Sequence, residues 1–116
     1  MYVDVEINDE QTVTLMVDTG ATDISLKSRI ATELGLSKGE SQEATYNTAN
    51  GPVQKFVTSL DSLRIGDIVH HNVQASFGEG LKDGFIDGLL GMSVLKYYTV
   101  DIDLTREELH LIPRQT

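Results

Sequence analysis

The chain has 116 residues, of which 40% are hydrophobic and 23% are charged, and these proportions are typical of one soluble globular domain. We therefore expect a single domain over residues 1–116. Eighteen acidic and nine basic residues give a formal net charge of -9, which disfavours nucleic-acid phosphates and anionic membrane surfaces as partners. The absence of cysteine excludes disulfides and thiolate chemistry.

The N-terminus carries no sign of a targeting segment. Met1 leads directly into an alternating strand pattern, without the basic start and apolar stretch of a signal peptide. No apolar run approaches the roughly 18 residues that a membrane-spanning helix needs. These features predict a cytoplasmic protein, or else a soluble piece of a longer one, such as a domain removed from a membrane-anchored parent.

The first part of the chain predicts a hairpin and a helix. Apolar and polar residues alternate over residues 2–7, and a β-branched, apolar run follows over residues 12–17. The turn-prone pair Asn8-Asp9 lies between them, so we expect two antiparallel strands. Apolar residues then recur at helical spacing over residues 25–36, where Gly35 provides a stop, and this pattern predicts one short helix.

The middle of the chain predicts further strands. Residues 43–50 and 53–68 are predicted strands joined at Asn50-Gly51, because both of these residues tolerate the positive φ of a type I′ turn. Residues 69–77 form another predicted strand, which leads into a glycine-rich stretch over residues 78–91.

The end of the chain predicts a short helix over residues 92–98 and a closing hairpin made of strands 99–104 and 108–112. A short internal echo is also present: an apolar strand enters a glycine-bearing turn at residues 15–20 and again at residues 86–91. Taken together, the predicted elements indicate a mostly β protein with one or two short helices.

Asp18 is the candidate for chemistry. It stands where an apolar strand enters a glycine turn, in the segment Val-Asp-Thr-Gly-Ala-Thr at residues 17–22. A carboxylate at the end of a buried strand costs free energy unless hydrogen bonds hold it or chemistry uses it. Gly20 lets a second backbone approach closely, and the Thr19 hydroxyl can hold the turn. Asp-Thr-Gly also arises by chance in roughly one chain in twenty of this length, so the tripeptide alone indicates only a turn.

Three motifs in chain order resemble those of the retropepsin-like aspartic proteases, the single-domain relatives of the retroviral enzymes, which include predicted bacterial and archaeal proteases. Residues 17–22 are similar to the family's active-site loop, with Asp18 at the catalytic aspartate. Residues 48–51 resemble the tip of its flap, and Leu89-Leu90-Gly91 resembles the turn before its helix. The resemblance covers nearly the whole chain. It implies an all-β, mainly antiparallel acid-protease barrel with a flap hairpin.

The chain carries half of the catalytic machinery that such an enzyme needs. Hydrolysis of an amide by carboxylates requires two of them close together, so that they share one proton. Asp-Thr-Gly occurs once, Leu89-Leu90-Gly91 holds no carboxylate in register, and Asp87 stands two residues before the apolar pair, in the wrong place. The simplest completion is a homodimer in which two copies of Asp18 meet at a two-fold axis.

The resemblance also implies roles for the residues around Asp18. Thr19 would bond across the two-fold axis to the other loop, and Thr19 and Gly20 would support the active-site loop. The residues implied to bind the substrate are Gly20, Ala21, Thr22 and Asp23 from the loop and Ala49, Asn50 and Gly51 from the flap tip. The flap, about residues 46–56, would close over the substrate and exclude water.

We therefore expect an aspartic endopeptidase that hydrolyses peptide bonds in extended polypeptide segments, each bound as an added strand. A water activated by the two aspartates would attack the peptide bond, without a cofactor, a metal or a covalent intermediate. The apolar residues Ile24, Val53 and Ile86 are candidates for lining subsites, which favours apolar substrate groups.

The expected dimer is weak and tighter at acidic pH. Residues 2–7 already form a predicted strand of the barrel, so no spare N-terminal segment is left for an interface, whereas residues 109–116 could provide one. A charge of -9 on each subunit opposes association at neutral pH and low salt.

Two other interpretations compete with the enzyme. The same fold could serve as a catalytically weak or inactive module for dimerisation or peptide binding, because a fold does not determine function. His70 and His71, with His110, suggest a metal site, but adjacent residues on a strand point to opposite faces, which disfavours chelation.

Overall fold

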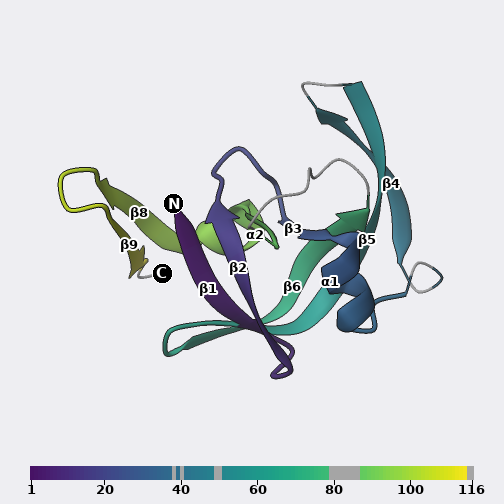
Figure 1. The fold of residues 1–116 in the computed structure, drawn as a ribbon, viewed down its shortest axis with the longest axis horizontal. Helices are drawn as coiled ribbons and strands as arrows, with labels where there is room; N and C mark the ends of the chain where they lie inside the picture. The colour runs from purple at the N-terminus through teal and green to yellow at the C-terminus, as the bar shows by residue number, and fades with distance from the viewer. Residues whose placement is uncertain (38, 40, 49–50, 79–86, 115–116) are drawn as a thin grey trace.

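The computed structural model describes residues 1–37, 39, 41–48, 51–78 and 87–114 (Figure 1). In chain order the elements are β1 (Tyr2–Ile7), β2 (Gln11–Val17), β3 (Ile24–Lys27), α1 (Ser28–Glu33), β4 (Gln42–Thr48), β5 (Gly51–Ile65), β6 (Ile68–Gly78), β7 (Gly88–Leu90), α2 (Met92–Leu95), β8 (Tyr98–Asp103) and β9 (Glu108–Pro113). This architecture confirms the predicted all-β class, with a small barrel and short helices. Within the described residues, no helix is long and apolar enough to cross a membrane.

The barrel closes through six of the described strands, in the order β1-β2-β7-β3-β6-β5, and β1 pairs back to β5. Strand β4 extends the sheet beyond β5, so the β4–β5 hairpin projects from one end of the molecule, while the separate β8–β9 hairpin projects from the other (Figure 1). Alternate residues of the barrel strands point inward and fill the interior, as in other small barrels. The largest fully buried side chains are Ile7, Leu15, Ile24, Leu26, Ile30, Leu60, Leu63, Leu90 and Leu95.

Two hairpins are confirmed where the sequence predicts them. Strands β1 and β2 pair antiparallel around Asn8 and Asp9, and both of these residues have a φ of 55°. Asparagine and aspartate tolerate this left-handed conformation better than most residues, which explains the tight turn at this point. Strands β8 and β9 form the closing hairpin, in which Tyr98 pairs with Pro113.

The predicted helix over residues 25–36 is wrong in its first turn. Residues Ile24–Lys27 are strand β3, which pairs with β6 on one side and with β7 on the other, and α1 spans only Ser28–Glu33. Apolar residues in a strand that is buried on both faces follow one another without alternation, so their spacing does not distinguish a short buried strand from a helix.

Three other boundaries differ from the prediction. Strand β5 ends at Ile65 and β6 begins at Ile68, because Gly66 adopts a φ of 58° and turns the chain there. Gly51 pairs with Thr48 and so begins strand β5, two residues earlier than predicted, whereas Ala49 and Asn50 lie outside the described part of the chain. Helix α2 is shorter than predicted because Tyr98 already begins β8.

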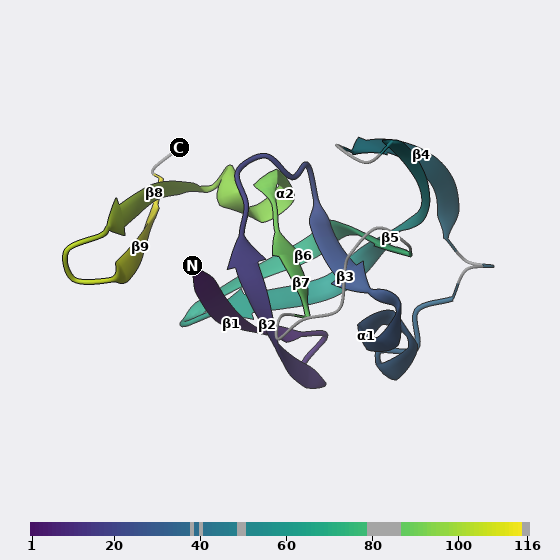
Figure 2. The same cartoon turned by 45° about the horizontal axis from the view of Figure 1, so that its top comes forward.

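The two segments of the internal echo lie side by side. Strands β2 and β7 run parallel, with Leu15 opposite Gly88 and Val17 opposite Leu90. Strand β7 therefore lies between β2 and β3 in the sheet, as Figure 2 shows. This arrangement brings the Leu89-Leu90-Gly91 motif directly beneath the loop that follows β2.

Asp87 holds the start of β7 against β2. Its Oδ2 atom accepts a hydrogen bond of 2.9 Å from the Thr14 backbone N–H, and its Oδ1 atom lies 3.1 Å from Arg29 Nη2. The Asp87 backbone N–H donates to the Thr14 carbonyl at 2.9 Å.

We expect Asp87→Ala to lower the free energy of unfolding by about 1–3 kcal/mol, because the partly buried Thr14 N–H loses its acceptor. Asp87→Asn is the matched control, since its carboxamide oxygen can still accept that bond. It loses only an ion pair in which the Arg29 side chain is 59% exposed, and exposed pairs contribute about 0–1 kcal/mol. Urea denaturation measures both variants, and equal destabilisation by the two would contradict this account.

Candidate active site

The Asp18 loop is held by hydrogen bonds at both of its ends. The Asp18 backbone N–H donates to the Leu90 carbonyl at 3.0 Å, and the Ala21 N–H donates to the Asp18 carbonyl at 3.1 Å. The Gly20 N–H donates to Asp18 Oδ1 at 2.9 Å, so the loop backbone orients the carboxylate. Asp18 is half-buried, whereas Thr19 and Gly20 are exposed. The carboxylate is therefore fixed in direction and still open to a ligand.

Glycines of the β7 segment let the chain pass close beneath this loop. A Cβ atom on Gly91 would lie 2.1 Å from the Asp23 carbonyl oxygen and 2.8 Å from that of Ala21. A Cβ atom on Gly88 would lie 2.0 Å from the Ser25 carbonyl oxygen. The Met92 N–H donates to the Ala21 carbonyl at 2.8 Å, which completes the contact. The apolar-apolar-glycine motif therefore supports the loop that carries Asp18.

A pocket of about 400 Å³ opens beside Asp18, between its loop and the β4–β5 hairpin. The loop side of the pocket includes Gly20, Ala21, Thr22 and Asp23. The hairpin side includes Tyr46 and Lys55. The structure therefore brings the predicted loop residues together with the hairpin that the resemblance identifies as a flap.

Asp23 is the centre of a buried polar cluster that joins β3, β4 and β6. The residue is 1% exposed, and its carboxylate accepts three hydrogen bonds. The donors are Tyr46 OH at 2.6 Å, Ser76 Oγ at 3.0 Å and Ser25 Oγ at 3.5 Å. Because Tyr46 belongs to β4, its bond to Asp23 ties the hairpin to the strand that follows the Asp18 loop.

Lys55 completes this cluster from β5. Its Nζ atom donates to Ser25 Oγ at 3.3 Å and lies 5.1 Å from the centre of the Tyr46 ring. Burial lowers the pKa of Lys55, and the charge of Asp23 opposes that shift. Burial, followed by the hydrogen bond to Asp23, raises the pKa of Tyr46 to about 12, so its hydroxyl remains a donor at any pH near neutral.

A comparison with known families decides what kind of loop this is. A family model described as "gag-polyprotein putative aspartyl protease" matches residues 3–97. The chain belongs to this family. A solved structure, the retropepsin-like aspartic protease from Rickettsia conorii, is similar with a TM-score of 0.76 and 34% identity, and the match covers 95% of this chain and 80% of that one. The recognition of a retropepsin-like aspartic protease from the sequence is therefore confirmed.

Two curated relatives are less informative about activity. A protein from Sinorhizobium sp, described as an uncharacterized protein in the cobV 5′ region, is 32% identical over 104 residues, which are 89% of this chain and 43% of that protein. The uncharacterized protein RP867 of Rickettsia prowazekii is 36% identical over 107 residues, which are 89% of this chain and 44% of that protein. The retropepsin-like chain thus spans less than half the length of these relatives.

The remaining predicted site residues of this retropepsin-like chain lie outside the pocket or outside the described residues. Thr19 and Gly51 do not line the pocket, and Gly51 lies in the hairpin at a φ of 104°. Ala49 and Asn50 lie outside the described part of the chain. Nothing in these positions contradicts their predicted roles, which stay predictions.

The expected apolar lining of the subsites is wrong at Ile24, which is fully buried in the core. Val53 does not line the pocket, and Ile86 lies outside the described residues. The sequence pattern indicates Asp23 but not its pocket neighbours Ser25, Tyr46 and Lys55, because a predicted helix over residues 25–36 hides the strand β3 that begins directly after Asp23. Residues two apart along an extended segment face the same side, so the spacing of Asp23 and Ser25 is the signal that could have revealed the cluster.

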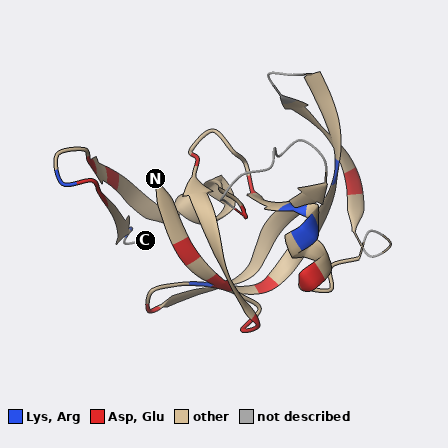
Figure 3. Cartoon of the chain, viewed as in Figure 1, with Lys and Arg blue, Asp and Glu red and all other residues tan. Residues whose placement is uncertain are grey.

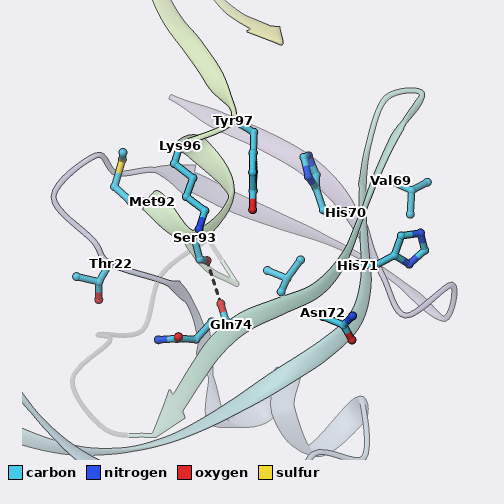
Figure 4. A pocket seen from close by; sticks show the side chains of 11 residues that line it. Thr22, Val69, His70, His71, Asn72, Gln74, Met92, Ser93, Lys96 and Tyr97 are labelled. Carbon is cyan, nitrogen blue, oxygen red and sulfur yellow. Dashed lines mark hydrogen bonds between the residues drawn. The ribbon is translucent and has the colours of Figure 1, made fainter. Parts of the chain in front are cut away.

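A second pocket of about 600 Å³ lies between β6 and α2 (Figure 4). His70 stacks on the Tyr97 ring with 5.5 Å between ring centres and shares a hydrogen bond of 2.6 Å with Tyr98 OH, while His71 points away from them. Burial, followed by the charge of His71, lowers the pKa of His70.

His110, the third histidine, lies on β9, where its Nε2 atom is 3.0 Å from Glu108 Oε2. Over the residues that the structure describes, no group of three or more His, Cys, Asp or Glu side chains could hold a metal.

Proposed function

We propose that the chain is an aspartic endopeptidase that cleaves extended polypeptide segments as a homodimer, with one Asp18 from each subunit. The observation that carries this proposal is the placement of the Asp18 carboxylate at an open pocket. The Gly20 N–H donates to its Oδ1 atom at 2.9 Å and so orients it. The family membership of the chain supports the same chemistry.

Two carboxylates at van der Waals distance cannot both ionise, so a pair of aspartates shares one proton and titrates as a unit. The ionised aspartate takes a proton from water while the protonated one polarises the substrate carbonyl. Water oxygen bonds to the carbonyl carbon, the C–N bond then breaks, and the leaving amine takes up a proton. No cofactor and no covalent intermediate enters this sequence.

A second subunit is needed because, among the described residues, the pocket offers no other free carboxylate. Asp23 also lines the pocket, but it is buried and its oxygens accept three hydrogen bonds. Asp87 is engaged by Thr14 and Arg29 and does not line the pocket. A second copy of Asp18, related by a two-fold axis, supplies the missing group.

The β8–β9 hairpin is the proposed interface. The pairing of the two strands puts Val100, Ile102, Leu109 and Leu111 on one face. Val100 and Leu111 pack against the barrel core, but Ile102 lies further along the hairpin and is 49% exposed. An isolated two-stranded hairpin is marginally stable in water, and a second copy that covers this face would stabilise it.

Charge opposes this association at neutral pH. Acidic residues occur on the barrel strands and on the β8–β9 hairpin (Figure 3), and each subunit carries -9. Acidification protonates carboxylates and weakens the repulsion, so we expect the dimer to be tighter near pH 5 than at pH 7.

We expect Ile102→Asp to raise the dissociation constant of the dimer at least tenfold, because truncating one interface anchor commonly costs about 1–2 kcal/mol and the new charge adds repulsion. Sedimentation over a range of concentrations measures the dimer, and activity should fall on dilution in parallel. Thr99→Asp is the matched control, since it places the same charge on the other face of β8. A wild-type protein that is monomeric at every pH and concentration and yet cleaves peptides would contradict the proposed homodimer.

The proposal itself is tested with an unfolded polypeptide mixture incubated with the wild-type chain between about pH 4 and 7, the range in which a shared-proton pair is competent. Cleavage that a statine-type transition-state mimic inhibits is the expected result. Binding of peptides without any cleavage would instead favour the module interpretation.

A further inference from the structure

We propose that Lys55 and Asp23 make the pocket beside Asp18 selective for a substrate side chain that ends in a carboxamide, as in glutamine or asparagine. This inference rests on the proposed function and specifies which substrates fit that site. It replaces the apolar preference that the sequence suggests, because the lining of the pocket includes two buried charged side chains, those of Lys55 and Asp23.

Lys55 is a buried cation with donor capacity to spare. The residue is 8% exposed and lines the pocket from the β4–β5 hairpin. An ammonium has three N–H donors, whereas within the described residues Nζ donates one side-chain hydrogen bond, to Ser25 Oγ at 3.3 Å. The Tyr46 ring at 5.1 Å offers its π face rather than a further acceptor atom. A substrate acceptor in the pocket would satisfy a group that burial has deprived of water.

Asp23 offers the complementary acceptor. A carboxylate has about four lone-pair positions, and Tyr46, Ser76 and Ser25 occupy three of those of Asp23. A carboxamide oxygen can accept from Lys55 Nζ while the amide N–H₂ donates to the remaining position on Asp23. Both partners belong to one cluster, because Ser25 accepts from Lys55 and donates to Asp23.

The same geometry disfavours the other classes of side chain. A substrate carboxylate would satisfy Lys55 but would add a negative charge beside Asp18 and Asp23, in a chain that already carries -9. A substrate lysine would face the Lys55 ammonium. An apolar side chain would displace water from Lys55 without replacing its hydrogen bonds, and sites built from buried polar groups strongly reject such ligands.

The two-fold symmetry of the proposed dimer repeats this pocket. One copy lies on each side of the scissile bond, at matched distances from the two aspartates. We therefore expect the carboxamide preference to occur at two substrate positions, one on each side of the cleaved bond.

The experiment compares peptides that are identical except for glutamine, methionine, glutamate or lysine at each of the three positions on either side of the cleaved bond. At one position per side, we expect kcat/KM for glutamine to exceed that for methionine roughly tenfold, the size of one buried hydrogen-bonding difference. Lys55→Met should reduce this ratio to about one, while Lys96→Met, which changes an exposed lysine of the other pocket, should leave it unchanged. Thermal unfolding checks that both variants are folded.

Several results would overturn the inference. These are equal cleavage of the methionine and glutamine peptides at every position, a preference for glutamate, or a glutamine preference that survives in Lys55→Met. Cleavage of the peptide set by the wild-type protein decides the first two of these results even if Lys55→Met does not fold. If no peptide is cleaved, the proposed protease function fails separately, and fluorescence anisotropy with the Asp18→Asn variant then tests the preference through binding. Equal or absent binding of the glutamine and methionine peptides also overturns it.

Discussion

Asp18→Asn is expected to lower kcat/KM for peptide hydrolysis by about 10³-fold or more, since general acid–base catalysis contributes up to about 10⁴-fold. A carboxamide neither takes a proton from water nor shares one with a partner. The substitution changes little else, because the side-chain carbonyl oxygen of the introduced asparagine can still accept the Gly20 N–H that Asp18 Oδ1 accepts at 2.9 Å. Fold and peptide binding should therefore be preserved.

Steady-state cleavage of an extended peptide near pH 5 measures this loss, and anisotropy of a labelled peptide measures binding. Asp61→Asn is the matched control, because it removes the same charge from an exposed position on β5, outside the pocket. Cleavage by Asp18→Asn at a rate close to that of wild type would remove Asp18 from the mechanism. If wild type and Asp18→Asn bind the peptide equally and wild type does not cleave it, the chain is a peptide-binding module.

Gly91→Ala is expected to destabilise the protein by at least about 3 kcal/mol, at the upper end of the usual cost of overpacking. The conformation at Gly91 is ordinary, with a φ of -102°, so space rather than strain is the reason. The new Cβ atom would lie 2.1 Å from the Asp23 carbonyl oxygen and 2.8 Å from that of Ala21. Neither oxygen belongs to a flexible side chain, so the backbone that carries the Asp18 loop must move.

Chemical denaturation measures the change, and the displaced loop should also lower activity in any variant that remains folded. Gly39→Ala is the control, because among the described residues its Cβ atom would meet only Ser37 Oγ at 3.5 Å, an ordinary contact. A Gly91→Ala variant with the denaturation midpoint of wild type would show that β7 does not pass as close beneath the loop as the structure places it.

The sequence by itself determined the features that depend on neighbours along the chain. Asn8 and Asp9 turn the first hairpin because their own backbone preferences allow a positive φ. The alternation of residues 2–7 marks a strand with one buried face. The Asp18 loop was recognised because an apolar strand, a carboxylate and a glycine are consecutive, and Leu89-Leu90-Gly91 because its pattern is equally local.

Only the tertiary structure decided the features that depend on residues far apart. Strand β3 exists because β6 and β7 pair with both of its edges, and no local pattern records those partners. The polar cluster joins Asp23, Tyr46, Lys55 and Ser76, whose positions span more than fifty residues of chain. Each of these side chains read alone is an ordinary surface residue. Their burial is tolerated because the sheet brings donors and acceptors together, so that each of these side chains makes at least one hydrogen bond. This arrangement is a property of strand order rather than of any one segment.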